Sequence, residues 1–498
     1  MEQRYAELKA RLAQIFDLRR TQELLFWDQT VMMPPAGAAV RSAQLSTLDR
    51  IAHELFVSDE TGGLLEELRP YEESLPYESD EASLIRVTRR DWEKARRVPA
   101  ELASEMVRAV SEGQDIWAKA REAADYELFR PHLEHALELK RRYVDCFEGY
   151  DDPYDVLLDD FERGMKTAEV RAVLDDLKAE LVPLIAEVGS TEPDEPFMSG
   201  PFPVEAQHEL SLHVLERLGY DPRCFRLDLT AHPFAAHSGT QDIRLTTRYV
   251  EDDLWSLFTA IHECGHGLYE HGVSPTLERT PLCIGVSYAL HESQSRLWEN
   301  IVGRSRPFWN HFYPRLQATF PDVLGDVDQE RWYRAINRVK PSYIRVDADE
   351  ATYNLHIILR FELEQELLEG RLALADLPEA WNARFEEYLG LAVPNDSLGV
   401  LQDVHWAGGG FGYFPTYTLG NIMSVQIWEK ALSELPDLPE QFEAGEFGQL
   451  HEWLRTRLYA LGRKFTPQET LERVVDGPLD AAPYVRYLKD KLGALAAA

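Results

Sequence analysis

Apolar residues recur every three or four positions along most of this chain, a spacing typical of amphipathic helices. The clearest segments are 5–25, 82–126, 131–150 and 167–188. The first of them is followed by a break at Met33-Pro34-Pro35, because proline has no N–H with which to continue a helix. The pattern therefore predicts a mainly helical protein.

Strict alternation of apolar and polar residues, the pattern of a half-buried strand, is rare in the sequence. It is clear over 242–250, where Ile243, Leu245, Thr247 and Tyr249 share one face. This segment predicts an edge strand with one buried face. The expected fold class is mainly α, with one small β-sheet beside a cleft.

Breaks between the helical segments are short. The best linker candidate is 189–203, which holds four prolines and two glycines, and a second break lies near 436–439. Neither is long enough to separate independently mobile domains. We therefore expect a single domain over residues 1–498.

The chain is strongly acidic, with 52 Lys and Arg against 86 Asp and Glu, so its formal net charge is −34. Such a charge repels phosphate backbones and anionic lipid, so neither nucleic acid nor a membrane is an expected partner. The N-terminus lacks a secretory apolar core, and no window is apolar for long enough to span a membrane. Four cysteines without a CxxC pair indicate reduced thiols, and the expected location is the cytoplasm.

The motif HECGH at 262–266 is the first chemical signal. The apolar stripe of the preceding residues predicts that it lies in a helix, where positions four apart share a face. His262 and His266 can then bind one metal ion, and Glu263, about 100° around the helix, can reach the ion's water as a general base. A buried, hydrogen-bonded histidine pair is the alternative.

A third ligand is expected, because catalytic zinc sites use three protein ligands and leave one position open. The segment 288–300, YALHESQSRLWEN, has helical spacing and follows His266 after a stop at Gly272 and Pro275. A helix that turns back at this stop would bring Glu292 to face the histidine pair. Acidic residues are common in this chain, so the helical phase of Glu292 carries the argument.

Several further segments occur in the order found in one known family. They are 27–48 (WDQTVMMPPAGAAVRSAQLSTL), 232–234 (HPF), 242–246 (DIRLT), 344–349 (IRVDAD) and 399–406 (GVLQDVHW). Together with HECGH and HESQS, they resemble the carboxypeptidase Taq family of zinc metallocarboxypeptidases over almost the whole chain.

This resemblance implies two helical lobes around a deep active-site cleft, similar to angiotensin-converting enzyme and the thimet-type oligopeptidases. It places N-terminal helices (1–60) at the cleft rim and the metal-binding core at about 230–420. It implies a carboxypeptidase of broad specificity that does not favour proline. It also implies Zn²⁺, with Co²⁺ as a possible substitute, peptide substrates with a free C-terminus, and a homodimer.

Stabilisation of the oxyanion needs a donor besides the metal. The glycine-rich segment 405–421 offers His405 and Tyr417, whose spacing matches a histidine and tyrosine pair in the similar oligopeptidases. Tyr413 is the second choice. The alternative is that both tyrosines are core aromatics.

Recognition of a free C-terminal carboxylate calls for an arginine. Arg345 in IRVDAD is preferred over Arg244 in DIRLT, and a surface or salt-bridged arginine is the alternative for Arg345. His232 is either a donor to the substrate backbone or a loop-fixing residue. Asp403 could orient a histidine, and we interpret Cys264 as buried filler.

Two other functions compete with a carboxypeptidase. The first is an endo-acting oligopeptidase on the same scaffold. The second is a catalytically inactive peptide-binding scaffold, against which the intact HECGH and Glu292 argue.

Overall fold

The computed structural model describes residues 1–188 and 195–497, and its contacts divide the chain into two compact units. Unit 1 comprises Met1–Arg96, Glu195–Ala335 and Ile427–Pro478. Unit 2 comprises Arg97–Asp194, Ile336–Gln426 and Leu479–Ala498. The predicted pair of helical lobes corresponds to these units, whereas the cleft and the likeness to angiotensin-converting enzyme stay predictions.

Unit 1 holds the small sheet and most of the helices. Its α-helices are α1 (Glu2–Val31), α2 (Ala38–Val57), α3 (Asp59–Glu67), α4 (Arg69–Ser74), α5 (Asp80–Arg97), α10 (Val204–Leu218), α11 (Trp255–Gly272), α12 (Tyr288–Arg296), α13 (Arg306–Thr319), α14 (Pro321–Leu324), α15 (Gln329–Ile336), α19 (Leu438–Glu443), α20 (Gly448–Arg457) and α21 (Pro467–Val475). A π-helical segment, η4 (Leu297–Val302), continues α12. Short 3-10 turns are η1 (Pro35–Gly37), η2 (Pro196–Ser199), η3 (Pro275–Leu277) and η7 (Tyr459–Leu461).

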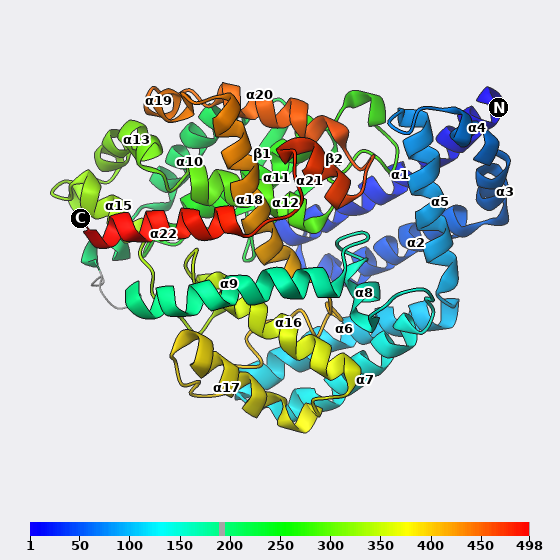
Figure 1. Ribbon diagram of the computed structural model, residues 1–498, viewed down its shortest axis with the longest axis horizontal. Helices are drawn as coiled ribbons and strands as arrows, with labels where there is room; N and C mark the ends of the chain where they lie inside the picture. Colours follow the sequence, from blue (N-terminus) through cyan, green and yellow to red (C-terminus); the bar gives the residue numbers. More distant parts are fainter. Residues whose placement is uncertain (189–194, 498) are drawn as a thin grey trace. The chain divides into compact units, whose positions relative to one another are not determined.

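Unit 2 consists of helices and the segments that connect them, without a strand among its described residues. Its helices are α6 (Ala100–Ala123), α7 (Tyr126–Val144), α8 (Pro153–Leu158), α9 (Thr167–Val188), α16 (Tyr353–Glu369), α17 (Leu377–Leu389) and α22 (Ala482–Ala497), with the turns η5 (Arg345–Asp347) and η6 (Leu374–Asp376). One of the boundaries between the units falls within α18 (Pro415–Glu434), between Gln426 and Ile427. The helical segments expected from the sequence are confirmed, as Figure 1 shows.

The sheet has three strands, β1 (Phe225–Leu229), β2 (Ala235–Gly239) and β3 (Asp242–Thr247), in the order β1-β3-β2. Strand β3 pairs parallel with β1 and antiparallel with β2. The prediction of an edge strand over 242–250 is therefore wrong, because β3 lies in the middle. Side-chain alternation reports which face of a strand is buried, and it does not report how many neighbours the backbone has.

The two predicted breaks have different outcomes. Part of the linker candidate, 189–194, lies outside the described residues, and the part that follows contains η2. The second break is confirmed, since α18 ends at Glu434 and α19 begins at Leu438. In the described residues, no helix combines the length and apolarity that crossing a bilayer requires.

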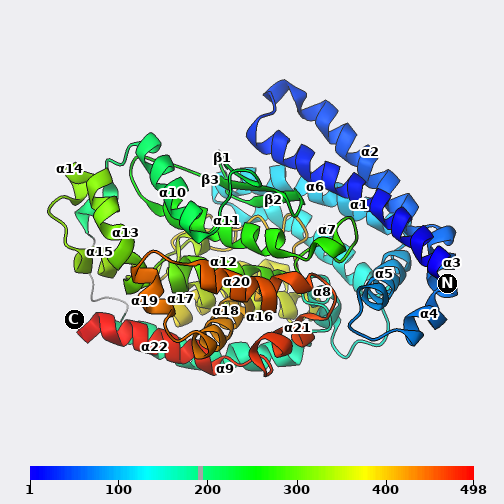
Figure 2. The same cartoon turned by 90° about the horizontal axis from the view of Figure 1, so that it is seen from above.

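The N-terminal helices form a long hairpin in unit 1, which Figure 2 shows as the paired ribbons of α1 and α2. Their apolar faces share a core with α3, α5 and the segment 273–283 that follows the HECGH helix. Leu8, Leu12 and Leu68 are fully buried there. This core ties α1 to the elements that carry the metal motif.

Candidate metal centre and active site

The HECGH motif lies inside α11, as the sequence predicts. Leu257, Phe258 and Ile261 of the preceding turns are buried and hold one side of the helix in the core of unit 1. His262 and His266 therefore project from the opposite side one turn apart, with ring centroids separated by 5.0 Å. The helix ends at Gly272, where the stop was predicted.

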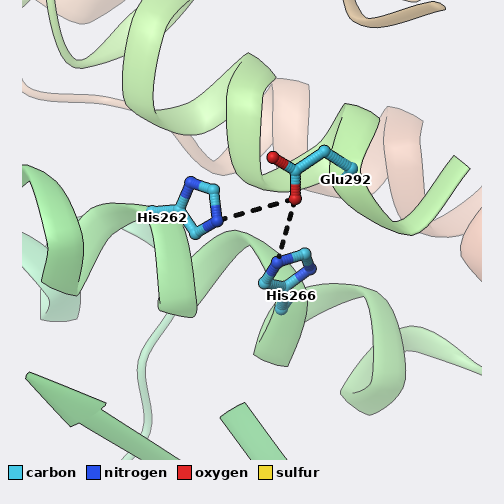
Figure 3. Close-up of side chains that lie close together, drawn as sticks. All are labelled: His262, His266 and Glu292. Carbon is cyan, nitrogen blue, oxygen red and sulfur yellow. Dashed lines mark ion pairs between the residues drawn. The ribbon is translucent and has the colours of Figure 1, made fainter. Parts of the chain in front are cut away.

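Glu292 of α12 faces this histidine pair, as Figure 3 shows. Its Oε2 lies 3.6 Å from Nε2 of His262 and 3.5 Å from Nε2 of His266. Four ligands at 2.0–2.1 Å around a tetrahedral zinc are about 3.3–3.4 Å apart. These side chains therefore fit a small divalent metal, with two neutral nitrogens and one carboxylate as donors.

Two glycines of α11 let its neighbours approach the motif. A Cβ on Gly265 would lie 2.6 Å from the carbonyl oxygen of Gln294 and 2.7 Å from Cα of Ser295, both in α12. A Cβ on Gly267 would lie 2.8 Å from the side chains of Ile243 and Leu245 in β3. The HECGHG sequence thus packs α11 directly against the backbone of α12 on one side and against the sheet on the other.

Each metal ligand has a polar partner that fixes its orientation. Nδ1 of His262 lies 2.9 Å from Oε2 of Glu299 in η4, which leaves Nε2 of His262 free to bind a metal. Nε of Arg296 donates to Oε1 of Glu292 at 2.7 Å, so Oε2 of Glu292 points to the histidines. Although burial opposes ionisation, the charges of Arg296 and His262 hold the pKa of Glu292 below its usual value.

Glu263 lies on the same helix and outside this set of three ligands. Its side chain is buried, and burial, reinforced by the charges of Glu292 and Glu299, raises the pKa of Glu263 to about 7. A carboxyl with a pKa near neutrality is suited to proton transfer. The neighbouring Cys264 is fully buried, which agrees with its interpretation as filler.

Unit 2 brings together His405, Tyr417 and Tyr413. The hydroxyl of Tyr417 is 3.5 Å from Nε2 of His405, and the ring of Tyr413 lies 5.2 Å from that of Tyr417. Both tyrosines are partly exposed, so neither is fully enclosed in the core. Burial lowers the pKa of His405 to about 4, so its imidazole is neutral at pH 7.

Arg345 is nearly buried in unit 2 and is paired with an acid. Its Nε and Nη2 donate to Asp403 at 3.1 and 2.8 Å, and its Nη1 donates to the hydroxyl of Tyr353 at 2.8 Å. Although burial opposes ionisation, Arg360 and Arg345 hold the pKa of Asp403 well below its usual range. These contacts engage three of the five N–H groups of the Arg345 guanidinium.

Arg244 and His232 belong to unit 1. Arg244 on β3 pairs with Asp242 at 2.9 Å and lies over the ring of Trp27 at 4.3 Å, so it ties α1 to the sheet. His232 is exposed in the segment between β1 and β2. The binding roles of both residues stay predictions.

Sequence analysis missed the residues that contact the candidate metal ligands and orient them. Glu299 lies seven residues after Glu292, and Glu270 lies four residues after His266, so helical spacing could have identified both. His291 directly precedes Glu292 and lies 2.6 Å from His266. One further acid, Glu364, accepts hydrogen bonds from the glycine-rich segment of unit 2.

Two histidines one helical turn apart, a carboxylate from a second helix and a buried glutamate beside the first histidine define a metallopeptidase centre of the HExxH type. The family described as carboxypeptidase Taq (M32) metallopeptidase matches residues 7–492. The chain belongs to this family and is a metal-dependent peptide hydrolase.

Relatives and solved structures agree over nearly the full length. Thermostable carboxypeptidase 1 of Thermus thermophilus is 41% identical over 488 residues, with 95% of each chain covered. The crystal structure of an M32 carboxypeptidase from Deinococcus radiodurans R1 is 40% identical with a TM-score of 0.96, and 100% of both chains is covered. A structure of Pyrococcus furiosus carboxypeptidase is 34% identical with a TM-score of 0.95, covering 98% of this chain and 99% of that one.

Proposed function

We propose that this chain is a zinc-dependent carboxypeptidase that releases C-terminal residues from peptides with broad specificity and disfavours proline at the scissile bond. The observation that carries the proposal is the geometry of His262, His266 and Glu292 beside the buried Glu263. Two imidazoles and one carboxylate are typical ligands of catalytic zinc, and Co²⁺ is expected to substitute. Curated relatives of this chain are named as carboxypeptidases, which supports the reaction class.

Zinc at this site would supply Lewis acidity, lowering the pKa of water and polarising the scissile carbonyl. In this proposal Glu263 accepts the proton of the attacking water and then delivers it to the leaving amine. Its pKa of about 7 allows both directions of transfer near neutral pH. Glu299 and Arg296 keep their ligands oriented during the reaction.

We assign Tyr417 and His405 to the developing oxyanion. A phenol and a neutral imidazole can each donate one hydrogen bond, and such a bond strengthens as negative charge accumulates. The contact between Tyr417 and His405 supports a joint role, with Tyr413 packed against both rings. His232 is assigned as a donor to the substrate backbone.

Arg345 is our candidate for binding the free C-terminal carboxylate. Its pairing with Asp403 fixes the guanidinium plane, and its hydrogen bonds within the described residues use three of its five N–H groups. Arg244 is second, because its motif precedes the metal-binding helices, whereas the motif of Arg345 lies beyond them in the sequence.

Digestion of a matched peptide pair tests the function. One peptide ends in a free acid and the other in an amide, and each is digested with and without a chelator, followed by mass spectrometry over time. Stepwise loss of C-terminal residues from the acid alone, abolished by the chelator and restored by zinc, is expected. Internal cleavage of both peptides would instead favour an endo-acting oligopeptidase. If neither peptide is cleaved, the catalytically inactive peptide-binding scaffold would be favoured.

The assembly and location of the protein are also proposals. Family resemblance supports a homodimer, and the four free cysteines support a reducing cytoplasm. Light scattering after size exclusion measures the mass directly, and a value of one chain, 57.2 kDa, would contradict the dimer. We also retain the expectation of one catalytic domain over 1–498.

A further inference from the structure

The second histidine of the metal motif contacts another histidine. Nδ1 of His266 lies 2.6 Å from Nδ1 of His291, and Nε2 of His291 lies 2.7 Å from Oε1 of Glu270. Glu270 is on α11, one helical turn beyond His266, and His291 is on α12. A continuous chain of hydrogen bonds thus leads from a metal ligand through one imidazole to a buried carboxylate.

Only one arrangement of protons satisfies this chain when a metal is bound. His266 must offer the lone pair of Nε2 to the metal, so its proton is on Nδ1 and is donated to Nδ1 of His291. His291 must then accept at Nδ1, which places its own proton on Nε2, facing Glu270. Each ring nitrogen has one role, and no two N–H groups point at each other.

Glu270 is held ionised at the end of the chain. The backbone N–H of Gly285 donates to its Oε1 at 3.0 Å, and Nε2 of His237 lies 3.3 Å from its Oε2. Although burial opposes ionisation, the hydrogen bond from His291 and the positive charge of Arg20 lower the pKa of Glu270. Nη1 of Arg20, in α1, donates to Nε2 of His237 at 3.0 Å, which places this charge behind the carboxylate.

The ring of His291 lies in a position shaped for it. A Cβ on Gly285 would lie 2.6 Å from Cδ2 of His291, so a side chain at residue 285 would displace the ring. On the other side, the ring of Tyr269 lies 5.2 Å away at an interplanar angle of 35°. This packing explains why a half-buried histidine keeps a fixed orientation.

We propose that His291 and Glu270 are positioning residues for the metal, and that they act in series on His266. The carboxylate polarises His291, and His291 in turn fixes the tautomer of His266 and strengthens its Nε2 as a donor. His262 receives the same support from Glu299 in a single step. The inference rests on the proposed function because it requires that the site binds zinc.

Zinc affinity directly tests this relay, by which we mean the hydrogen bonds that lead from His266 through His291 to Glu270. Outer partners of metal ligands usually change affinity by about 10–100-fold. His291→Phe keeps a ring and removes the acceptor, so its zinc Kd should rise within that range. Glu270→Gln keeps the shape and removes the charge, and its Kd should rise by about tenfold. Kd is measured by competition with a chelator of known affinity, and the visible spectrum of the Co²⁺-substituted protein reports the ligand geometry.

The double variant separates a relay from independent packing. If Glu270 acts only through His291, adding Glu270→Gln to His291→Phe should change the zinc Kd no further. Gly285→Ala, which alters neither partner chemically, should also weaken zinc binding because it displaces the ring. His271→Phe is the matched control, because His271 follows Glu270 directly and undergoes the same substitution. Its ring contacts the carbonyl oxygen of Thr240 and has no part in the relay, so this variant should keep the wild-type zinc Kd.

Three outcomes would overturn the inference. Unchanged zinc Kd in both single variants would show that the chain of bonds does not support the metal. Losses that multiply in the double variant would show that the two residues act separately. A wild-type protein that fails to bind one zinc would overturn the proposed function and the relay together. If the wild type binds zinc normally, the results from the variants test the relay alone.

Discussion

Glu263 lies beside the three candidate metal ligands and outside their cluster, so an experiment can decide whether it is a ligand or a general base. Glu263→Gln should keep one zinc per chain, because His262, His266 and Glu292 are intact. Its kcat should fall by about 10²–10⁴-fold, the usual contribution of general acid–base catalysis. Elemental analysis and initial rates measure the two quantities. Glu292→Ala is the control that should lose zinc, and loss of zinc from the Gln variant would make Glu263 a ligand.

Tyr417 is tested by separating kcat from KM. If its phenol donates to the oxyanion, Tyr417→Phe should lower kcat on the order of 10²-fold and leave KM nearly unchanged, because the bond strengthens only in the transition state. Steady-state kinetics on one free-acid peptide measure both constants. Tyr413→Phe, in contact with the same rings, is the matched comparison. A normal kcat in Tyr417→Phe would return this residue to a packing role.

At the scale of single residues, the sequence identifies candidate site residues where a short motif fixes their spacing. The spacing of HECGH and the helical phase of Glu292 were sufficient to bring together the three candidate ligands, because a helix converts sequence spacing into direction. His291 and Glu364 have no such signature. Their roles depend on which element packs opposite them, and that information is absent from a local pattern.

At the scale of elements, Glu364 of α16 holds the glycine-rich segment that carries His405 and Tyr417. It accepts from Nε1 of Trp406 at 2.7 Å and from the N–H of Gly412 at 2.9 Å. Burial raises the pKa of Glu364 to about 7, although these hydrogen bonds oppose the shift. Folding therefore favours the protonated form of this carboxyl.

This shift gives a pH dependence with a definite sign. The contribution of Glu364 is fully present below the unfolded pKa of 4.5 and is lost as pH rises through about 7. Relative to Glu364→Gln, which does not titrate, the wild type should lose about 3 kcal/mol of unfolding free energy between pH 4.5 and 8. Urea unfolding of both proteins at several pH values measures the difference. Parallel pH profiles would contradict the raised pKa.

The elements themselves were predicted unevenly. Helices such as α9 follow the apolar periodicity from end to end, because each buries a single face. Strand β3 was recognised and given the wrong neighbours, since its pairing depends on β1 and β2, neither of which was recognised from the sequence.

At the scale of the whole molecule, the three metal ligands all belong to unit 1. A ligand that binds only the folded state stabilises it by RT ln(1 + [L]/Kd), about 4 kcal/mol at a thousandfold excess over Kd. Removing zinc should therefore accelerate amide hydrogen exchange in α11, α12 and η4, and should leave α9 and α16 of unit 2 nearly unchanged. Exchange mass spectrometry with and without chelator measures this, and equal acceleration in both units would contradict it.

The division into units was beyond the reach of sequence patterns. The predicted metal-binding core, about 230–420, contributes to both units, with HECGH in one and Arg345, His405 and Tyr417 in the other. Each unit is assembled from three separated segments, and such long-range contacts leave no local mark on composition or periodicity.

The contact at Gly265 has a consequence for which ions the centre can hold. Because backbone atoms of α12 lie where a Cβ on Gly265 would be, the two helices are already at contact distance, and rotation of a side chain cannot change their spacing. An octahedral ion with bonds of 2.0–2.1 Å, such as magnesium, would need neighbouring ligands about 2.8–3.0 Å apart, closer than the tetrahedral spacing of zinc. Close-packed interiors resist such a compression. Selection by coordination geometry is thus set by the main chain of two helices, and Gly265→Ala, which forces them apart, should weaken zinc binding.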